Sequence, residues 1–233
     1  MTLARRDRAI IVSIALALSG SCMASAATAQ PVAEGGVLHS NSTEGLQLAT
    51  WVTATQDNRQ LPFIVIDKFE AEVLLFDGQG LLRGVTPALL GIAHGDDASP
   101  GVGDKELSEI GPAEKTTPAG RYLARLGPAK GNQQVLWVDF STSVALHPVI
   151  TTNPKEHRLD RLQSPTPKDN RITFGCINVP AAFFQDLVLP SFSEAGGMVY
   201  ILPESKFLIE VFPAFQIFAP PIERSAESTV TGD

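Results

Sequence analysis

The chain has 233 residues, of which 44% are hydrophobic and 18% are charged, and this composition excludes a disordered protein. A formal net charge of −7 excludes the basic surface that nucleic-acid binding requires. The length allows one domain, or one domain with a long extension. Two cysteines, Cys22 and Cys176, are too few for a disulfide framework.

Residues 1–29 have the features of an export signal. Three arginines precede an apolar run over 9–18, which is too short to span a bilayer, and two Ala-x-Ala cleavage sites follow. The alternative is a retained membrane anchor. Cleavage would leave no stable anchor and would remove Cys22, so that Cys176 is the single cysteine of an exported protein.

Signals for β-structure dominate the rest of the chain. In residues 30–60, the hydrophobic residues follow no sustained helical or strand period. We interpret this segment as an N-terminal extension that packs on the domain or stays mobile. The tail, 204–233, is rich in Pro and Phe, and its end from Ser225 is predicted to be disordered. Strands are predicted at 63–66, 72–76, 81–85, 89–93, 121–126, 134–140, 144–147 and 198–202, with short helices at 154–162 and 181–189. This order predicts a mostly β fold, a sandwich or barrel with one or two short helices.

The most informative stretch is 173–178, Thr-Phe-Gly-Cys-Ile-Asn. Its cysteine is either a small buried hydrophobe or a nucleophile, and a nucleophile needs a base and donors for an oxyanion. Gly175 lets the backbone approach a substrate closely, and the N–H groups of Gly175 and Cys176 are the candidate oxyanion donors. Arg171 either supplies positive charge to the thiolate or to a substrate carboxylate, or is an ordinary surface arginine.

The base should be one of four histidines. We interpret His39, in the extension, and His94, in a loop, as solvated surface residues. His147 ends an apolar strand and is the preferred base. His157 lies in the polar run 155–158 and remains the alternative.

The stretch 173–178 resembles the signature of the YkuD-type L,D-transpeptidases, in which Ser or Thr is followed by His, Gly, Cys, an apolar residue and Asn or Arg. Five of six positions match, and Phe174 stands in place of the histidine. Segments 91–93, 116–122 and 198–203 also resemble the family, so the likeness spans about 61–203. It implies an L,D-transpeptidase-like β-sandwich or barrel as catalytic domain, in which Thr173 and Asn178 bind substrate or order the site.

The spacing between the family's histidine and the signature bears on the base. His147 is separated from Thr173 by 25 residues and His157 by 15. The shorter separation fits the family, whereas the local setting favours His147. Under that choice, residues 148–170 form an enlarged loop over the site.

The resemblance implies a transferase of cell-wall biogenesis and cell shape, located in the periplasm or facing the cell wall. Cys176 attacks a peptidoglycan peptide stem, His147 takes the thiol proton, and an amine of a second stem resolves the thioester. No cofactor or metal is expected, peptidoglycan stems are the partner, and the oligomeric state is left open. With water as acceptor, the chain is an L,D-carboxypeptidase or endopeptidase. The Phe174 departure also allows a catalytically weak wall-binding module.

Overall fold

The structure is a computed structural model that describes residues 38–217, so the predicted signal over 1–29 and the end of the tail lie outside the described residues. The mostly β fold is confirmed, and every strand predicted from the sequence has a counterpart. The strands are β1 (Phe63–Asp67), β2 (Glu72–Phe76), β3 (Leu82–Pro87), β4 (Leu90–Gly91), β5 (Gly120–Pro128), β6 (Gln134–Asp139), β7 (Val144–Pro148), β8 (Arg171–Thr173), β9 (Ile177–Val179) and β10 (Gly197–Ile201).

Eight of these strands form one sheet, in the order β3-β2-β1-β10-β5-β6-β7-β9, and β4 pairs with β8. The pairs β1–β10 and β7–β9 are parallel, and the other pairs of the large sheet are antiparallel. Leu89 follows the edge strand β3 and exchanges two backbone hydrogen bonds with Asn178 in the opposite edge strand, at 2.8 and 2.9 Å. The sheet therefore nearly closes on itself, and this closure lies beside the signature stretch.

Two hydrophobic cores lie on the two faces of the sheet, because successive side chains of a strand point to opposite faces. In β1, Ile64 and Ile66 join the core inside the curved sheet, whereas Phe63 and Val65 join the second core. All five residues of β1 are buried, as expected for a strand covered on both faces. Strands β7 and β9 pack on the inner core through Val144 and Leu146 of β7 and Ile177 and Val179 of β9.

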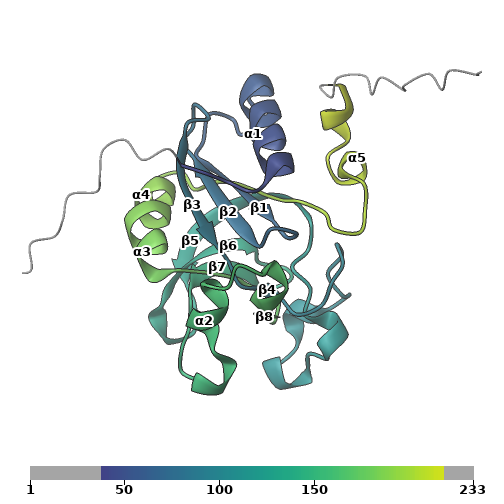
Figure 1. The fold of residues 1–233 in the computed structure, drawn as a ribbon, viewed down its shortest axis with the longest axis vertical. Coiled ribbons are helices and arrows are strands. Elements are labelled where there is room, and N and C mark those ends of the chain that lie inside the picture. Colours follow the sequence, from purple (N-terminus) through teal and green to yellow (C-terminus); the bar gives the residue numbers. More distant parts are fainter. Residues whose placement is uncertain (1–37, 218–233) are drawn as a thin grey trace, which may run out of the picture. The chain divides into compact units, whose positions relative to one another are not determined.

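Helix α1 (Thr43–Thr55) covers the second core, within the segment that the sequence left without a predicted element (Figure 1). Ser42 caps it, since its hydroxyl accepts the Gly45 N–H at 2.9 Å and donates to Asp67 of β1. Leu48, Ala49 and Val52 form the buried face of the helix. The part of the extension within α1 thus packs on the sheet.

The remaining helices are short. They are α2 (Arg158–Leu162), α3 (Ala181–Phe183), α4 (Leu189–Phe192) and α5 (Leu208–Val211), with a π-helical turn over Phe184–Val188. Pro180 precedes α3, as predicted, and Phe184, Val188 and Phe192 close one side of the inner core. None of the helices within residues 38–217 has the length and apolar character needed to cross a membrane.

Candidate active site around Cys176

Cys176 lies in the turn between β8 and β9, on the face of the sheet that points away from the inner core. The parallel pairing of β7 with β9 sets Leu146 opposite Ile177 and His147 opposite Asn178. Leu146 and Ile177 both belong to the inner core. The next residue on each strand, His147 and Asn178, therefore points to the opposite face of the sheet. The structure therefore brings the predicted nucleophile, the preferred base and Asn178 to one surface.

The turn at Cys176 depends on Gly175 and Thr173. Gly175 has a φ of +123°, where a residue with a side chain would be strained, and a Cβ there would lie 2.7 Å from the Thr116 carbonyl oxygen. The buried Thr173 hydroxyl donates to the Cys176 carbonyl at 2.6 Å and accepts the Gly175 N–H at 3.2 Å. Thr173 thus orders the turn, and the Gly175 N–H is engaged in this structure.

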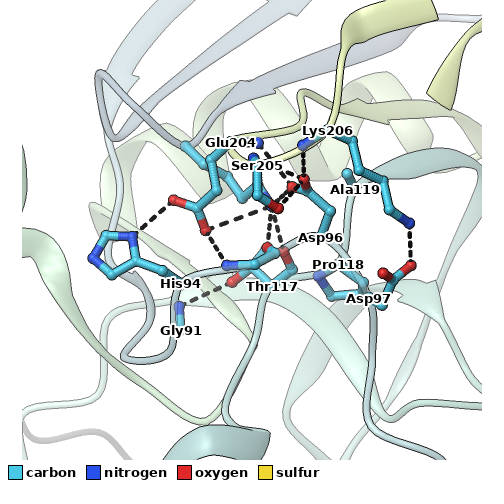
Figure 2. A network of polar contacts seen from close by, with 12 residues as sticks. Gly91, His94, Asp96, Asp97, Thr117, Pro118, Ala119, Glu204, Ser205 and Lys206 are labelled. Atoms are coloured by element: carbon cyan, nitrogen blue, oxygen red, sulfur yellow. Dashed lines mark hydrogen bonds and ion pairs between the residues drawn. The ribbon is translucent and has the colours of Figure 1, made fainter. Parts of the chain in front are cut away.

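A second threonine ties the turn to the rest of the fold. The hydroxyl of Thr117, which has no exposed surface, accepts the Gly91 N–H and donates to the Gly175 carbonyl, both at 2.9 Å. Figure 2 shows Thr117 directed toward Gly91, at the edge of a larger polar network. The segment 116–122, which carried part of the family resemblance, therefore supports the cysteine turn from behind.

The Cys176 thiol is half-buried and donates to the Ser143 carbonyl at 3.6 Å. Burial raises the pKa of the thiol, and the Ala145 N–H and the Arg158 guanidinium lower that pKa by less. Within residues 38–217, neither His147 nor His157 is hydrogen-bonded to the thiol. The thiol therefore has the Ser143 carbonyl, rather than a histidine, as its hydrogen-bond partner.

His147 is mostly enclosed, and both of its ring nitrogens have partners. Nδ1 lies 2.8 Å from the Pro148 carbonyl oxygen, and Nε2 lies 3.0 Å from Nδ2 of Asn178. Burial lowers the pKa of the imidazole, the Pro148 carbonyl raises it, and the charge of Arg158 lowers it further. The lowered pKa favours the neutral form of the imidazole.

Cys176 and His147 open on a common pocket of about 190 Å³. Its walls are mostly apolar, with Trp137 on β6 and Ile150 after β7, and Lys130 adds a cation. Trp137 packs against the largely exposed Phe140, with ring centroids 4.9 Å apart. The pocket thus combines apolar walls with one cation.

His157 lies elsewhere. Its exposed side chain faces Asp160 at 3.1 Å and lines two other cavities, of about 440 and 240 Å³, that do not include Cys176. The structure does not bring the alternative base to the thiol.

Arg171 also points away from the thiol. It forms an ion pair with Glu204 at 2.5 Å and donates to the Lys68 carbonyl at 2.9 Å, beside a cavity of about 420 Å³. Glu204 also contacts His94 (Figure 2). The same carboxylate accepts the Gly95 N–H. Arg171 thus joins β8 to the segment after β10, and the cation that acts on Cys176 and His147 is Arg158.

Phe174 lies at the surface, 36% exposed, with Lys115 Nζ 3.6 Å from its ring centroid. This distance is that of a cation–π contact. The position where the family signature has a histidine is therefore occupied here by an aromatic ring that pairs with a cation.

Arg158 is the site residue that sequence reasoning missed. It reaches from α2, in the loop over 148–170, and donates to Oδ1 of Asn178 at 2.6 Å. It belongs to the polar run 155–158, and nothing in the sequence marked it as a site residue. Through this contact, the loop over 148–170 reaches Asn178.

No protein-family model and no curated protein sequence matches the chain. Among solved structures, it aligns with an L,D-transpeptidase from Xylanimonas cellulosilytica at 15% identity and a TM-score of 0.36, over 60% of each chain. The catalytic domain of the E. faecium L,D-transpeptidase aligns at 15% identity and a TM-score of 0.33, over 61% of this chain and 98% of that one. The helical cell shape determining protein Pgp2 from Campylobacter jejuni aligns at 10% identity and a TM-score of 0.39, over 70% of this chain and 57% of that one. The matches thus span less than two thirds of the Xylanimonas and Campylobacter chains.

Proposed function

We propose that this chain is an exported cysteine acyltransferase that acts on peptidoglycan peptide stems by L,D-transpeptidation. The observation that carries the proposal is the common pocket that Cys176, in the strained turn after Gly175, shares with His147 on β7. The substrate class rests on the resemblance of 173–178 to the family signature, and export rests on the composition of 1–29.

In the proposed reaction, Cys176 Sγ attacks the carbonyl between an L-centred diamino acid residue and a terminal D-residue. The thiol proton passes to Nε2 of His147, which then protonates the leaving amine. The Cys176 N–H is the proposed oxyanion donor, and the Gly175 N–H joins it when it leaves Thr173. An amine of a second stem opens the thioester, whereas water in that role gives a carboxypeptidase or endopeptidase.

The pocket supports a peptide substrate. Lys130 offers a cation for the carboxylate of the terminal D-residue, and Trp137 offers an apolar wall for the stem. The strained turn keeps Cys176 in the lining of this pocket and out of the two hydrophobic cores.

A catalytically weak wall-binding module is the second candidate. Two observations favour it: the thiol donates to a carbonyl rather than to a base, and burial raises its pKa. Phe174 in place of the signature histidine points the same way.

Purified protein incubated with a tetrapeptide stem and an acceptor amine tests the first candidate, with mass spectrometry of the products. We expect cross-linked or D-residue-free stems with the wild type and neither with Cys176→Ala. His147→Ala should abolish turnover, whereas His157→Ala should retain it. Product formation by Cys176→Ala would overturn the acyltransferase proposal. Binding of stems without turnover or a carbapenem adduct would favour the wall-binding module.

A further inference from the structure

The protonation state of His147 follows from its neighbours. The Pro148 carbonyl can only accept a hydrogen bond, so Nδ1, 2.8 Å away, carries the proton. A neutral imidazole then has its lone pair on Nε2, and Nε2 must accept from the Asn178 amide at 3.0 Å. His147 is thus held as the Nδ1–H tautomer.

The same tautomer follows independently from Arg158. An amide side chain can be turned in either sense, and its neighbours decide which end is oxygen. Arginine has donors only, so the amide atom 2.6 Å from Nη1 of Arg158 is the oxygen of Asn178. The amide NH₂ therefore faces Nε2 of His147. The contact of Asn178 with Arg158 and the contact of His147 with Pro148 thus imply the same tautomer.

We propose, on the basis of the proposed function, that Arg158 is a positioning residue that acts through the Asn178 amide to keep His147 in the proton-accepting tautomer. Arg158 is suited to this role because its side chain is 13% exposed and is paired with Glu156 beside it. Without a donor-only partner, the amide is free to turn its oxygen toward Nε2. Because the Pro148 carbonyl still holds the proton on Nδ1, an amide oxygen at Nε2 would favour the doubly protonated ring, with a proton taken up from solvent. The acceptor for the thiol proton would then be lost.

The proton balance is consistent with this role. When Cys176 becomes a thiolate, its proton moves to Nε2, the Asn178 amide gives up that nitrogen, and Nδ1–H stays on the Pro148 carbonyl. The resulting imidazolium returns the Nε2 proton to the leaving amine. Arg158 is the charged group that faces His147 from α2, and Cys176 faces it from the turn before β9.

Arg161 provides a matched control on the same helix. It holds the loop through the Glu156 and Asp169 carbonyls, at 2.9 and 2.6 Å. Arg161→Gln therefore loosens the loop but leaves the donor to Asn178 in place. Arg158→Lys keeps a side chain with donors only, whereas Arg158→Gln keeps much of the length but can also accept.

The test is ¹⁵N NMR of the histidine ring nitrogens in the full chain, together with the rate of carbapenem acylation at Cys176. In the wild type, Arg161→Gln and Arg158→Lys, we expect Nε2 of His147 to be unprotonated near neutral pH. In Arg158→Gln, we expect a protonated Nε2 population and an acylation rate lower by about tenfold or more. A protonated Nε2 in the wild type would overturn the inference whatever the variants do, including a variant that fails to fold.

This experiment distinguishes a failure of the positioning role of Arg158 from a failure of the acyltransferase proposal. If Nε2 stays unprotonated in Arg158→Gln and the wild type acylates, the positioning role is overturned and the acyltransferase proposal is left intact. If Nε2 becomes protonated in Arg158→Gln but the chain neither acylates nor processes stems, the role of Arg158 is supported and the proposed function is overturned.

Discussion

Nε2 of His147 lies 3.0 Å from the side-chain nitrogen of Asn178, the residue opposite it on the neighbouring parallel strand. The contact joins the preferred base to the last residue of the signature stretch. It depends on strand register, because a shift of one residue would turn one of the two side chains into the core.

Asn178→Asp replaces the amide that donates to Nε2 of His147 with a carboxylate. The carboxylate can only accept, so Nε2 must carry a proton to pair with it. We expect the pKa of His147 to rise from its lowered value to above its usual range, with an imidazolium that persists to higher pH. An NMR titration of the histidine ring measures this. Asn153→Asp, in the exposed loop, adds the same charge and should leave the titration of His147 unchanged. A His147 pKa that does not rise would contradict the contact.

The thiol of Cys176 should react more slowly than a free cysteine at neutral pH. Burial raises its pKa, so the thiolate fraction grows only as the pH rises past the usual range. In a Cys22→Ser background, we expect iodoacetamide alkylation of the folded protein to keep increasing above pH about 8.5, where an ordinary cysteine is half ionised. The same thiol in denaturant is the control. A plateau near neutral pH in the folded protein would show an activated thiolate instead.

Thr117→Val removes the hydroxyl that bridges Gly91 and Gly175. Two buried backbone groups lose their partner, and each such loss costs about 1–3 kcal/mol. We therefore expect the free energy of unfolding to fall by about 2–6 kcal/mol, measured by denaturant titration. Thr116→Val is the control, because Thr116 is also a buried residue and its hydroxyl makes no hydrogen bond with a side chain or backbone group of the described residues. Equal losses in the two variants would count against the bridging role.

Asp96 and Lys68 form a buried ion pair at 2.7 Å, with neither side chain exposed. The carboxylate also accepts the N–H groups of Glu204, Ser205 and Lys206, which binds the segment after β10 to the loop after β4 (Figure 2). Removing one partner of a buried pair costs about 3–5 kcal/mol, so Asp96→Ala should destabilise the fold by that amount. Asp97→Ala breaks only the exposed pair with Lys206 and should cost less than about 1 kcal/mol. Similar values for the two variants would contradict this.

The Asp96 carboxyl also makes the stability of the fold depend on pH. Burial alone would raise the pKa of Asp96, but hydrogen bonds from Lys68, Ser205, Glu204 and Lys206 together hold that pKa well below its usual range. A lowered folded-state pKa contributes stability above the unfolded value of about 3.9, and this contribution is lost as the pH falls below it. We expect the Asp96→Ala variant to lose less stability than the wild type between pH about 5 and 2, measured by thermal unfolding. Equal losses of stability in the wild type and in Asp96→Ala would show that the Asp96 carboxyl is not the source of the pH dependence.

The strands could be predicted because their signal is local. Runs such as 63–66 and 134–140 carry β-branched and apolar residues between turn residues, and they became β1 and β6. Helix α1 was missed although its signal is present. Ser42 is a capping residue, and Gly45, Leu48, Ala49 and Val52 follow the spacing of one helical face, but the surrounding polar residues obscured that pattern.

By itself, the sequence determined the mostly β character of the fold and the turn that holds Cys176, because both depend on neighbours along the chain. Only the tertiary structure decided which charged groups meet. Arg171, five residues before the cysteine, pairs with Glu204, whereas Arg158, eighteen residues before it, reaches Asn178. The physical reason is that an ion pair or hydrogen bond depends on distance in space. That distance is set by the register of β7 on β9 and by the path of the 148–170 loop, neither of which is encoded in local composition.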